Sequence, residues 1–287
     1  MSDGNETLDA SCCCASCGIA ELDDIKLVPC DGCDLVRYCS DACREDHKAD
    51  HEEACKKRAA DLREEILFRQ PECTHRGDCP ICTVPIPLDP AKSGMYMCCS
   101  KVICKGCAQA NQMREIRMRL RQSCPFCRKP LPKTQEEHDK LNMKRVEAND
   151  PDALCHEGVK QYNKGNYHGA FKYWTKAAAM DNVEAHYQLS LLYLQGKGVE
   201  KDEGKEMLHL EEAAIGGHPD ARCMLGLNEM DKGNAKRAAK HFLISAKQGD
   251  DLSIKSLMEA FKQGFVEKDD LASALRAYQV AVDATKT

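Results

Sequence analysis

Eighteen of the 20 cysteines in this chain of 287 residues lie between Cys12 and Cys127. The other two, Cys155 and Cys223, fall in a C-terminal part rich in Ala, Leu, Lys and Glu. The chain begins with a polar, acidic stretch, Met1–Glu6, unlike the basic and then apolar start of a secretory signal. We therefore expect a reducing compartment, in which clustered thiolates bind metal rather than form disulfides. This distribution predicts a metal-clamped N-terminal half followed by a second part with a different fold.

The overall composition excludes several classes of protein. Charged residues make up 30% of the chain and the mean hydropathy is −0.55. No apolar stretch approaches the roughly 20 residues that a membrane helix needs. A formal charge of −5 argues against a dedicated nucleic-acid protein, because phosphate contacts require a basic excess. We expect two or three small domains in an intracellular protein, cytoplasmic or nuclear, whose partners are proteins rather than membranes or nucleic acid.

The first cysteine cluster contains four closely spaced ligand pairs, enough for two tetrahedral zinc sites. The pairs are Cys14–Cys17, Cys30–Cys33, Cys39–Cys43 and His51–Cys55. Two intervening residues around a tight turn let both sulfurs face one ion, and Gly32 relieves the backbone of one such turn. A separation of four residues places both ligands on one helix face. His47 could compete with His51, but only His51 has a cysteine four residues later. The alternative is a set of buried cysteines without metal.

The arrangement, with the aromatic Tyr38 directly before Cys39, resembles the MYND zinc finger. Ligand pairs interleave in that family, and the gap between the first two pairs is slightly long here. The Trp often found between Cys43 and His51 is absent, and Lys48 stands there instead. The resemblance implies one zinc site of Cys14, Cys17, Cys39 and Cys43 and another of Cys30, Cys33, His51 and Cys55. We place this finger at residues 12–55 and a helical linker at 56–72, with a helix over Lys56–Gln70.

Within residues 73–133, a second set of eight cysteines reads Cys79-Pro80-Ile81-Cys82, Cys98-Cys99, Cys104-x2-Cys107 and Cys124-Pro125-Phe126-Cys127. This pattern resembles a RING finger with an all-cysteine ligand set. Lys101 stands near the position of the usual RING histidine, so the adjacent Cys98 and Cys99 have to serve as ligands. The resemblance implies two cross-braced sites. One ion takes Cys79, Cys82, Cys104 and Cys107, and the other takes Cys98, Cys99, Cys124 and Cys127.

Four closed zinc sites leave no open position for water, so all four zinc ions are expected to be structural. RING proteins act by binding a ubiquitin-conjugating enzyme and orienting its thioester, which is catalysis by positioning. Three residues match the family's contact positions for that enzyme, namely Ile81, Pro125 and Arg128. The alternative is that Ile81 and Pro125 only pack within their zinc knuckles, and the Trp typical of the contact groove is absent.

A helix-like run lies between Cys107 and Cys124. Met113, Ile116 and Leu120 make one face, and basic side chains make another. The basic side chains are Arg114, Arg117, Arg119 and Arg121. Because no aromatic stacking residues accompany the arginines, we favour a solvated helix face over a nucleic-acid surface.

The chain repeats itself beyond a charged helical connector at residues 134–151. Ala153, Ala185, Ala221 and Ser253 occupy matching positions, and Leu189, Leu225 and Leu257 follow four residues later, with Glu157 breaking the series. The stretch Tyr193–Asp202, with its Gly196-Lys197-Gly198 loop, resembles a Sel-1-like repeat, a relative of the tetratricopeptide repeat. The resemblance implies about four stacked helix pairs over 152–287 that expose a protein-binding groove. We expect Trp174 in the core between repeats.

The predicted fold is thus a set of small zinc-bound α+β fingers followed by an all-α solenoid of stacked helix pairs. The favoured function is a modular adaptor of the ubiquitin-ligase type, with a client on the repeats and the conjugating enzyme on the RING-like finger. The alternative is a non-enzymatic scaffold with structural zinc fingers. Lysine methylation, known from MYND-bearing methyltransferases, has no matching catalytic residues here. Cys12, Cys13 and Cys73 could replace an assigned ligand, and Cys155 and Cys223 are expected to pack as small apolar residues.

Overall fold

A computed structural model describes residues 13–22 and 24–285, so Cys12 lies outside the described residues. The chain divides into two compact units, Met1–Arg69 and Gln70–Thr287, and each is described by itself. Across these described ranges, no helix has both the length and the apolar character needed to cross a bilayer.

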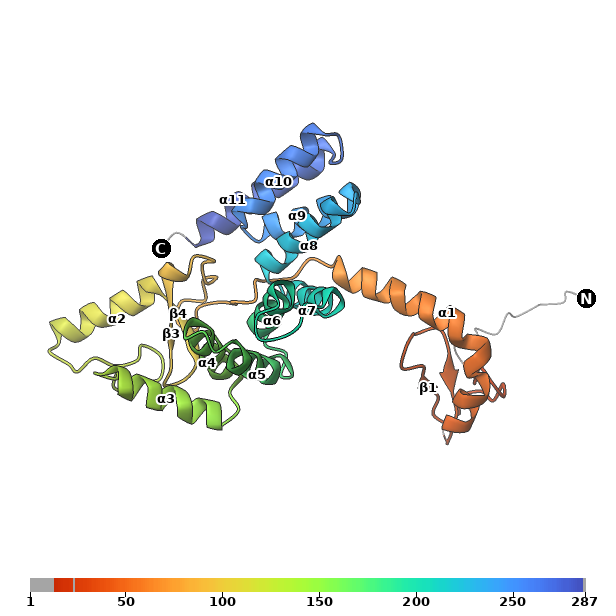
Figure 1. The fold of residues 1–287 in the computed structure, drawn as a ribbon, viewed down its shortest axis with the longest axis horizontal. Helices are drawn as coiled ribbons and strands as arrows, with labels where there is room; N and C mark the ends of the chain where they lie inside the picture. The colour runs from red at the N-terminus through yellow and green to blue at the C-terminus, as the bar shows by residue number, and fades with distance from the viewer. Residues whose placement is uncertain (1–12, 23, 286–287) are drawn as a thin grey trace, which may run out of the picture. The chain divides into compact units, whose positions relative to one another are not determined.

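The first unit contains a short hairpin and one long helix (Figure 1). Strand β1 (Val28–Pro29) pairs antiparallel with β2 (Arg37–Tyr38). Cys14, Leu27 and Tyr38 form a small buried core beside this hairpin. A core of this size stabilises a unit of about 70 residues only weakly, so further cross-links are needed.

Helix α1 (Asp41–Leu67) is longer than the sequence indicated. The side chain of its N-cap, Ser40, accepts a hydrogen bond of 3.2 Å from the N–H of Cys43. The helix predicted over Lys56–Gln70 is its second half, and no Gly or Pro interrupts the stretch 41–67. The last ligand pair of the finger therefore lies on the same helix as the expected linker, and no break in the backbone separates the two.

The second unit begins with the RING-like region. A short 3₁₀ helix, η2 (Pro90–Lys92), leads into β3 (Ser93–Tyr96), which pairs antiparallel with β4 (Lys101–Cys104). Helix α2 (Lys105–Arg117) follows at once, and its N-cap Cys104 accepts from the N–H of Cys107. Ile86 and Ile103 form a small core together with Cys79 and Cys104.

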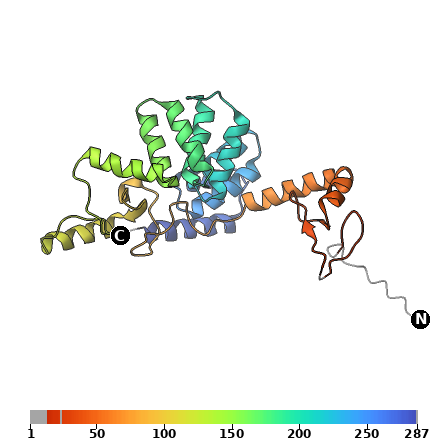
Figure 2. The same cartoon turned by 90° about the horizontal axis from the view of Figure 1, so that it is seen from below.

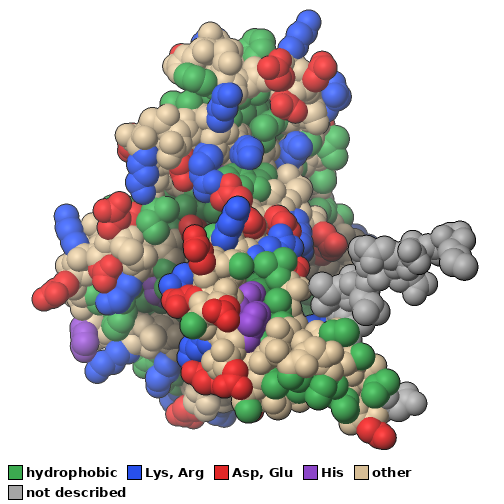
Figure 3. Space-filling model, turned by 90° about the vertical axis from the view of Figure 1, so that its right-hand side faces the viewer, with side chains coloured by type: hydrophobic (Ala, Val, Ile, Leu, Met, Phe, Trp, Pro, Cys, Tyr) green, Lys and Arg blue, Asp and Glu red, His purple; other side chains and the backbone are tan. Residues whose placement is uncertain are grey.

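Helix α2 ends earlier than the run predicted between Cys107 and Cys124. Its last residue is Arg117, and Arg119 has a left-handed φ of 53°. Met113 and Ile116 are each 60% exposed, and the four arginines of this stretch are exposed as well. The face of α2 is thus solvated. On the opposite side of the molecule, Figure 3 shows acidic and basic side chains interspersed.

Helix α3 (Gln135–Glu147) occupies the predicted connector and precedes eight helices that pair in sequence order. The pairs are α4 (Pro151–Asn163) with α5 (Tyr167–Ala178), α6 (Val183–Gln195) with α7 (Glu203–Ile215), α8 (Pro219–Asp231) with α9 (Ala235–Lys247), and α10 (Asp251–Lys262) with α11 (Lys268–Ala284). Figure 2 shows the helices α4 to α7 standing side by side. The predicted all-α solenoid is confirmed.

The first helix of every pair starts in the same way, which explains the repeated small residue. The capping side chains are those of Asp150, Asn182, His218 and Asp250, and they accept from the N–H groups of Ala153, Ala185, Ala221 and Ser253. All four of these donor residues are fully buried. A larger side chain at this position would hold neighbouring helices apart, since a well-packed core leaves no room for extra atoms.

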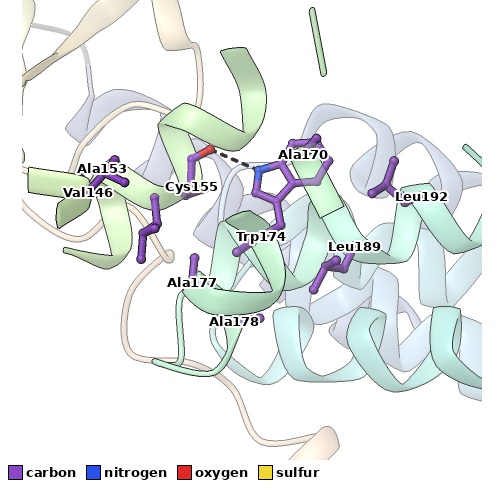
Figure 4. Packing of buried hydrophobic residues seen from close by; sticks show 11 residues of the cluster. Val146, Ala153, Cys155, Ala170, Trp174, Ala177, Ala178, Leu189 and Leu192 are labelled. Atoms are coloured by element: carbon purple, nitrogen blue, oxygen red, sulfur yellow. Dashed lines mark hydrogen bonds between the residues drawn. The ribbon is translucent and has the colours of Figure 1, made fainter. Parts of the chain in front are cut away.

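Trp174 lies in a core that the first repeat shares with Leu189 and Leu192 of α6 in the second repeat, as the sequence predicts (Figure 4). Its indole Nε1–H donates a hydrogen bond of 3.1 Å to the carbonyl of Cys155. Glu157, which breaks the leucine series, is also buried, and Asn142 of α3 donates to its carboxylate at 3.0 Å. The first repeat thus uses a polar pair where later repeats use leucine, because α3 rather than another repeat covers this end.

Candidate metal centres and partner surfaces

The first unit brings together the two ligand groups that the MYND resemblance implies. In each group the candidate ligand atoms all lie within 4.8 Å of one another, and the groups are Cys14, Cys17, Cys39, Cys43 and Cys30, Cys33, His51, Cys55. The Sγ atoms of Cys17 and Cys39 lie 3.5 Å apart, and Nε2 of His51 lies 3.2 Å from Sγ of Cys33. Such spacings match the ligand edges of a tetrahedral site with metal bonds of about 2.0–2.3 Å.

The neighbours of these groups explain why the particular residues are used. His47 takes no part, because its Nδ1 lies 3.1 Å from the hydroxyl of Tyr38. A Cβ on Gly32 would lie 2.9 Å from Sγ of Cys55, so glycine is needed for close approach of this sulfur. Its φ is not left-handed, so the turn itself does not require glycine, contrary to the expectation from sequence.

The pKa values of the cysteine thiols support the binding of a cation between them. Hydrogen bonds with Cys17 and Cys43 raise the pKa of Cys39 to about 12. Burial works against ionisation of Cys14, but backbone N–H groups, led by that of Cys17, lower its pKa to about 6. One thiolate forms readily and the next is resisted, so full ionisation of such a group requires a nearby positive charge. Zn²⁺ suits donor sets of this kind.

The RING-like region contains two further groups, and they interleave along the chain. They are Cys79, Cys82, Cys104, Cys107 and Cys98, Cys99, Cys124, Cys127, with ligand atoms again within 4.8 Å. The Sγ atoms of Cys98 and Cys127 lie 3.4 Å apart, and those of Cys99 and Cys124 lie 3.8 Å apart. The adjacent Cys98 and Cys99 therefore point into the same group.

Two loops of this region are built alike. The N–H of Thr83 donates to the carbonyl of Cys79, and the N–H of Arg128 donates to that of Cys124, at 2.9 and 3.0 Å. Both donors have left-handed φ angles, of 57° and 62°. We call these loops, residues 79–84 and 124–129, the two knuckles. Their shared geometry turns the backbone so that two cysteine side chains of each knuckle converge.

The knuckles expose only part of the expected contact set. Ile81 is 42% exposed, and Arg128 is exposed with its guanidinium donating to Oδ1 of Asn111 at 2.6 Å. Pro125, the third residue of the expected contact set, is buried. The next residue, Phe126, is 44% exposed and offers the apolar surface instead.

The remaining described cysteines lie outside these four groups. Cys13 forms an isolated bridge with Ala20, and Cys73 is exposed. Cys155 and Cys223 are buried in the solenoid, and burial raises the pKa of Cys223 to about 11, so its thiol stays neutral.

A fifth group escaped the sequence analysis. His75, Glu184 and His218 bring their polar atoms within 4.8 Å of one another. Widely separated segments supply these residues, so no spacing motif indicates them. The one available signal is that His218 stands at the cap position where the other three repeats have Asp or Asn. The group borders a cavity of about 1090 Å³ between residues 70–92 and the starts of α6, α8 and α10.

Comparison with known families gives two matches. Residues 14–55 match the MYND finger, and residues 154–182, 183–218 and 219–250 match the Sel1 repeat. No curated protein matches the chain. Neither family match covers the RING-like region or the fourth helix pair.

Among solved structures, two Sel1-type proteins are similar. One is c5321, a protective antigen present in uropathogenic Escherichia coli strains displaying an SLR fold, with 22% identity, a TM-score of 0.42, and coverage of 54% of this chain and 34% of that one. The other is a Sel1 repeat protein from Oxalobacter formigenes, with 23% identity, a TM-score of 0.46, and coverage of 52% and 46%. The chain thus spans less than half the length of either.

The finger and the repeats define the class at a coarse level. A MYND finger implies zinc binding, and Sel1 repeats generally mediate protein–protein interactions. Together they support a zinc-binding protein-interaction adaptor.

Proposed function

We propose that this chain is an adaptor of the ubiquitin-ligase type. The RING-like finger, residues 73–133, recruits a charged ubiquitin-conjugating enzyme, and the solenoid, residues 152–287, holds the client protein. The observation that carries the proposal is the interleaving of two four-cysteine groups across residues 79–127, with apolar side chains exposed on both knuckles. Interleaving ties the knuckles into one body, which a positioning catalyst requires.

We also propose that all four cysteine-rich groups bind structural zinc. Each group offers four ligands, so no coordination position is left for water or substrate. The expected content is four zinc ions per chain, measured by native mass spectrometry. A content of two would remove one finger from the proposal.

Autoubiquitination with a panel of conjugating enzymes tests the ligase function. Ile81→Ala and Phe126→Ala should each reduce activity at least about tenfold while all four zinc ions remain, since buried contacts at a small interface carry most of its energy. Leu208→Ala removes a side chain that is 54% exposed on the solenoid and is the matched control. Inactivity of folded, zinc-loaded protein with every enzyme would contradict the proposal.

A non-enzymatic scaffold is the second candidate, and one observation favours it. Pro125 is buried, which removes one of the three residues expected to contact the conjugating enzyme. A scaffold would bind its clients through the repeats and show no dependence on Ile81 in the ubiquitination assay.

A further inference from the structure

The segment that leads into the RING-like finger is fastened to the solenoid. We call residues 70–78 the connecting segment. The N–H of His75 donates to the carbonyl of Gly217 at 2.9 Å, and the side chain of Gln248 donates to the carbonyl of Cys73 at 3.4 Å. Gly217 has a φ of +84°, and a Cβ there would lie 2.7 Å from the carbonyl oxygen of Cys73. Glycine at this joint therefore lets the two backbones touch.

Neighbouring side chains of the connecting segment reach in two directions. Arg76 donates to the carbonyl of Leu88 at 3.1 Å and to Oγ of Ser93 at 2.6 Å, both in the RING-like finger. Nε2 of His75 lies 3.5 Å from Oε2 of Glu184, at the start of α6 in the solenoid. Two consecutive residues thus join the finger to the repeats.

A second histidine shares the same carboxylate oxygen. Nε2 of His218 lies 3.3 Å from Oε2 of Glu184, and its side chain is 3% exposed. The two imidazole rings stack with centroids 4.1 Å apart and planes only 3° from parallel. The other carboxylate oxygen of Glu184 accepts from Gln188 at 2.7 Å. Glu184 is the centre of this arrangement.

The cap of α8 fixes which nitrogen of His218 holds the proton. Its Nδ1 accepts from the N–H of Ala221 at 3.4 Å, so a neutral ring has its proton on Nε2, facing Glu184. The caps of the other repeats are carboxylate or amide oxygens, and the amide of Asn182 likewise caps its helix and donates, in its case to Oδ1 of Asp152 at 3.0 Å. In the third repeat, His218 caps α8 through Nδ1 and donates to Glu184 through Nε2.

The same geometry disfavours a metal ion, although three candidate ligands for one are present. A metal lies near the plane of each imidazole that binds it, and planes 3° from parallel do not meet at one ion. Coordination through Nε2 of His218 would also put a proton on Nδ1, against the N–H of Ala221.

We infer that His75, Glu184 and His218 form a hydrogen-bonded clamp that holds the RING-like finger in a fixed position on the solenoid and loosens as pH falls. The clamp goes beyond the proposed ligase function, because it describes how two parts of the chain are joined whatever they bind.

The direction of the pH effect follows from burial and charge. Burial lowers the pKa of His75 below 6.5, with Glu184 opposing. A released His75 therefore takes up a proton more readily than a clamped one, so acid favours release as pH falls below about 6.5. Burial alone would raise the pKa of Glu184, but hydrogen bonds from His218 and His75 hold it well below its ordinary value, so its contribution is lost only in stronger acid.

The main influences on the pKa of His75 besides burial are Glu184, His218 and Arg76. Among the described residues, the other charged and titratable side chains that line the cavities at the clamp are Glu72, Cys73, Asp78, Asp89, Lys92, Lys101, Asp152, Cys155, His156, Asp181, Tyr187, Asp220, Lys247, Asp250 and Asp251. The ring of Tyr187 lies 4.2 Å from that of His218. Arg76 disfavours a further positive charge on His75, in the same direction as burial.

Hydrogen exchange of the full, zinc-loaded chain, followed by mass spectrometry, tests the clamp. The measured quantity is the protection factor of the peptide that covers residues 73–78, corrected for intrinsic exchange at each pH. His218→Asn keeps a capping oxygen for α8 but has no Nε2, and Glu184→Gln removes the charge. Each should lower protection about tenfold at pH 7.5, because a hydrogen bond to a charged group is worth at least that factor in an equilibrium. His168→Asn and Glu200→Ala, at exposed positions, are the matched controls.

Wild-type protection should fall as pH is lowered from 7.5 to 5.0, and His218→Asn should show a smaller fall, because His218 contributes to the lowering of the His75 pKa. Glu184→Gln removes the group that opposes that lowering, so this variant is compared with wild type at pH 7.5 alone. Trp174 fluorescence and zinc content verify that each variant is folded. Equal protection in wild type and variants, or protection that is independent of pH, would overturn the inference. Added Ni²⁺ that raises protection in wild type but not in Glu184→Gln would overturn it in favour of a metal site. Because no conjugating enzyme is present, the result does not depend on ligase activity.

Discussion

Gly158 and Trp174 are fitted to each other across the first helix pair of the solenoid. A Cβ on Gly158 would lie 2.3 Å from Nε1 of the indole, which is buried and hydrogen-bonded to Cys155. The third pair repeats the relationship, since a Cβ on Gly226 would lie 2.5 Å from the ring of Phe242. A missing side chain on one helix makes room for the large aromatic on the next.

Gly158→Ala should therefore destabilise the solenoid by about 1–3 kcal/mol, as overpacking of a full core does. The measurement is urea unfolding followed by the fluorescence of Trp174, the only tryptophan in the chain. Gly204→Ala, also within a helix, is the control, because the nearest atom to its Cβ is 3.4 Å away and alanine favours helix. Equal midpoints for Gly158→Ala and wild type would refute the steric argument.

Cys98→Ser should remove one zinc ion per chain, because serine is a poor ligand for zinc and the group of Cys98 then has three thiolates. Cys73→Ser should leave the zinc content unchanged, since Cys73 is exposed and lies outside the four groups. Native mass spectrometry of both variants decides the point. Loss of zinc from Cys73→Ser, or none from Cys98→Ser, would show that the ligands are assigned wrongly.

Removal of metal should unfold the fingers and spare the solenoid. The two main solenoid cores contain none of the proposed ligands, whereas the cores of the fingers include Cys14, Cys79 and Cys104. Structural zinc contributes roughly 10–16 kcal/mol of apparent binding free energy, which is comparable to a whole domain's stability. After chelation, protease should cut residues 13–133 while Trp174 fluorescence stays native. A chain that resists protease throughout would contradict the prediction.

His209 should make the solenoid less stable in acid. Burial lowers its pKa to about 4, with a further contribution from His186. The histidine pKa of the unfolded chain is near 6.5, so between about pH 6.5 and 4 the unfolded state binds more protons than the folded state. The free energy of unfolding therefore decreases as the pH is lowered through that window. His209→Gln should flatten the dependence of the urea midpoint on pH, and His168→Gln should not. An unchanged slope in His209→Gln would place the acid sensitivity elsewhere.

Asn142→Ala should destabilise the packing of α3 on the first repeat by about 1–3 kcal/mol. The change leaves the buried carboxylate of Glu157 with one hydrogen-bond donor, Gln161, in place of two. The double variant Asn142→Ala/Glu157→Leu should recover part of the lost stability, because the later repeats have leucine at the position of Glu157. Urea unfolding of the single and double variants measures the coupling, and strict additivity would show that the two residues do not interact.

Much of the architecture follows from patterns that are local in the sequence. Ligand pairs two to four residues apart converge because a turn or one helical turn brings them together, so Cys30 with Cys33 and His51 with Cys55 can be paired without a structure. The repeats are visible for a similar reason, since each helix pair has a small residue, Ala or Ser, three positions after its cap. The spacing of the ligand pairs does not show which two pairs combine into one four-ligand group. That assignment came from the family resemblance.

Tertiary structure decided what depends on contacts between distant segments. Helix α1 continues unbroken through the expected linker, and Pro125 is buried while Phe126 is exposed, since packing rather than residue type sets exposure. The proximity of His75, Glu184 and His218 is indicated in the sequence only by the unusual helix cap His218. Local geometry is fixed by a few dihedral angles, whereas such a meeting depends on the accumulated curvature of several stacked helices, which only the folded solenoid provides.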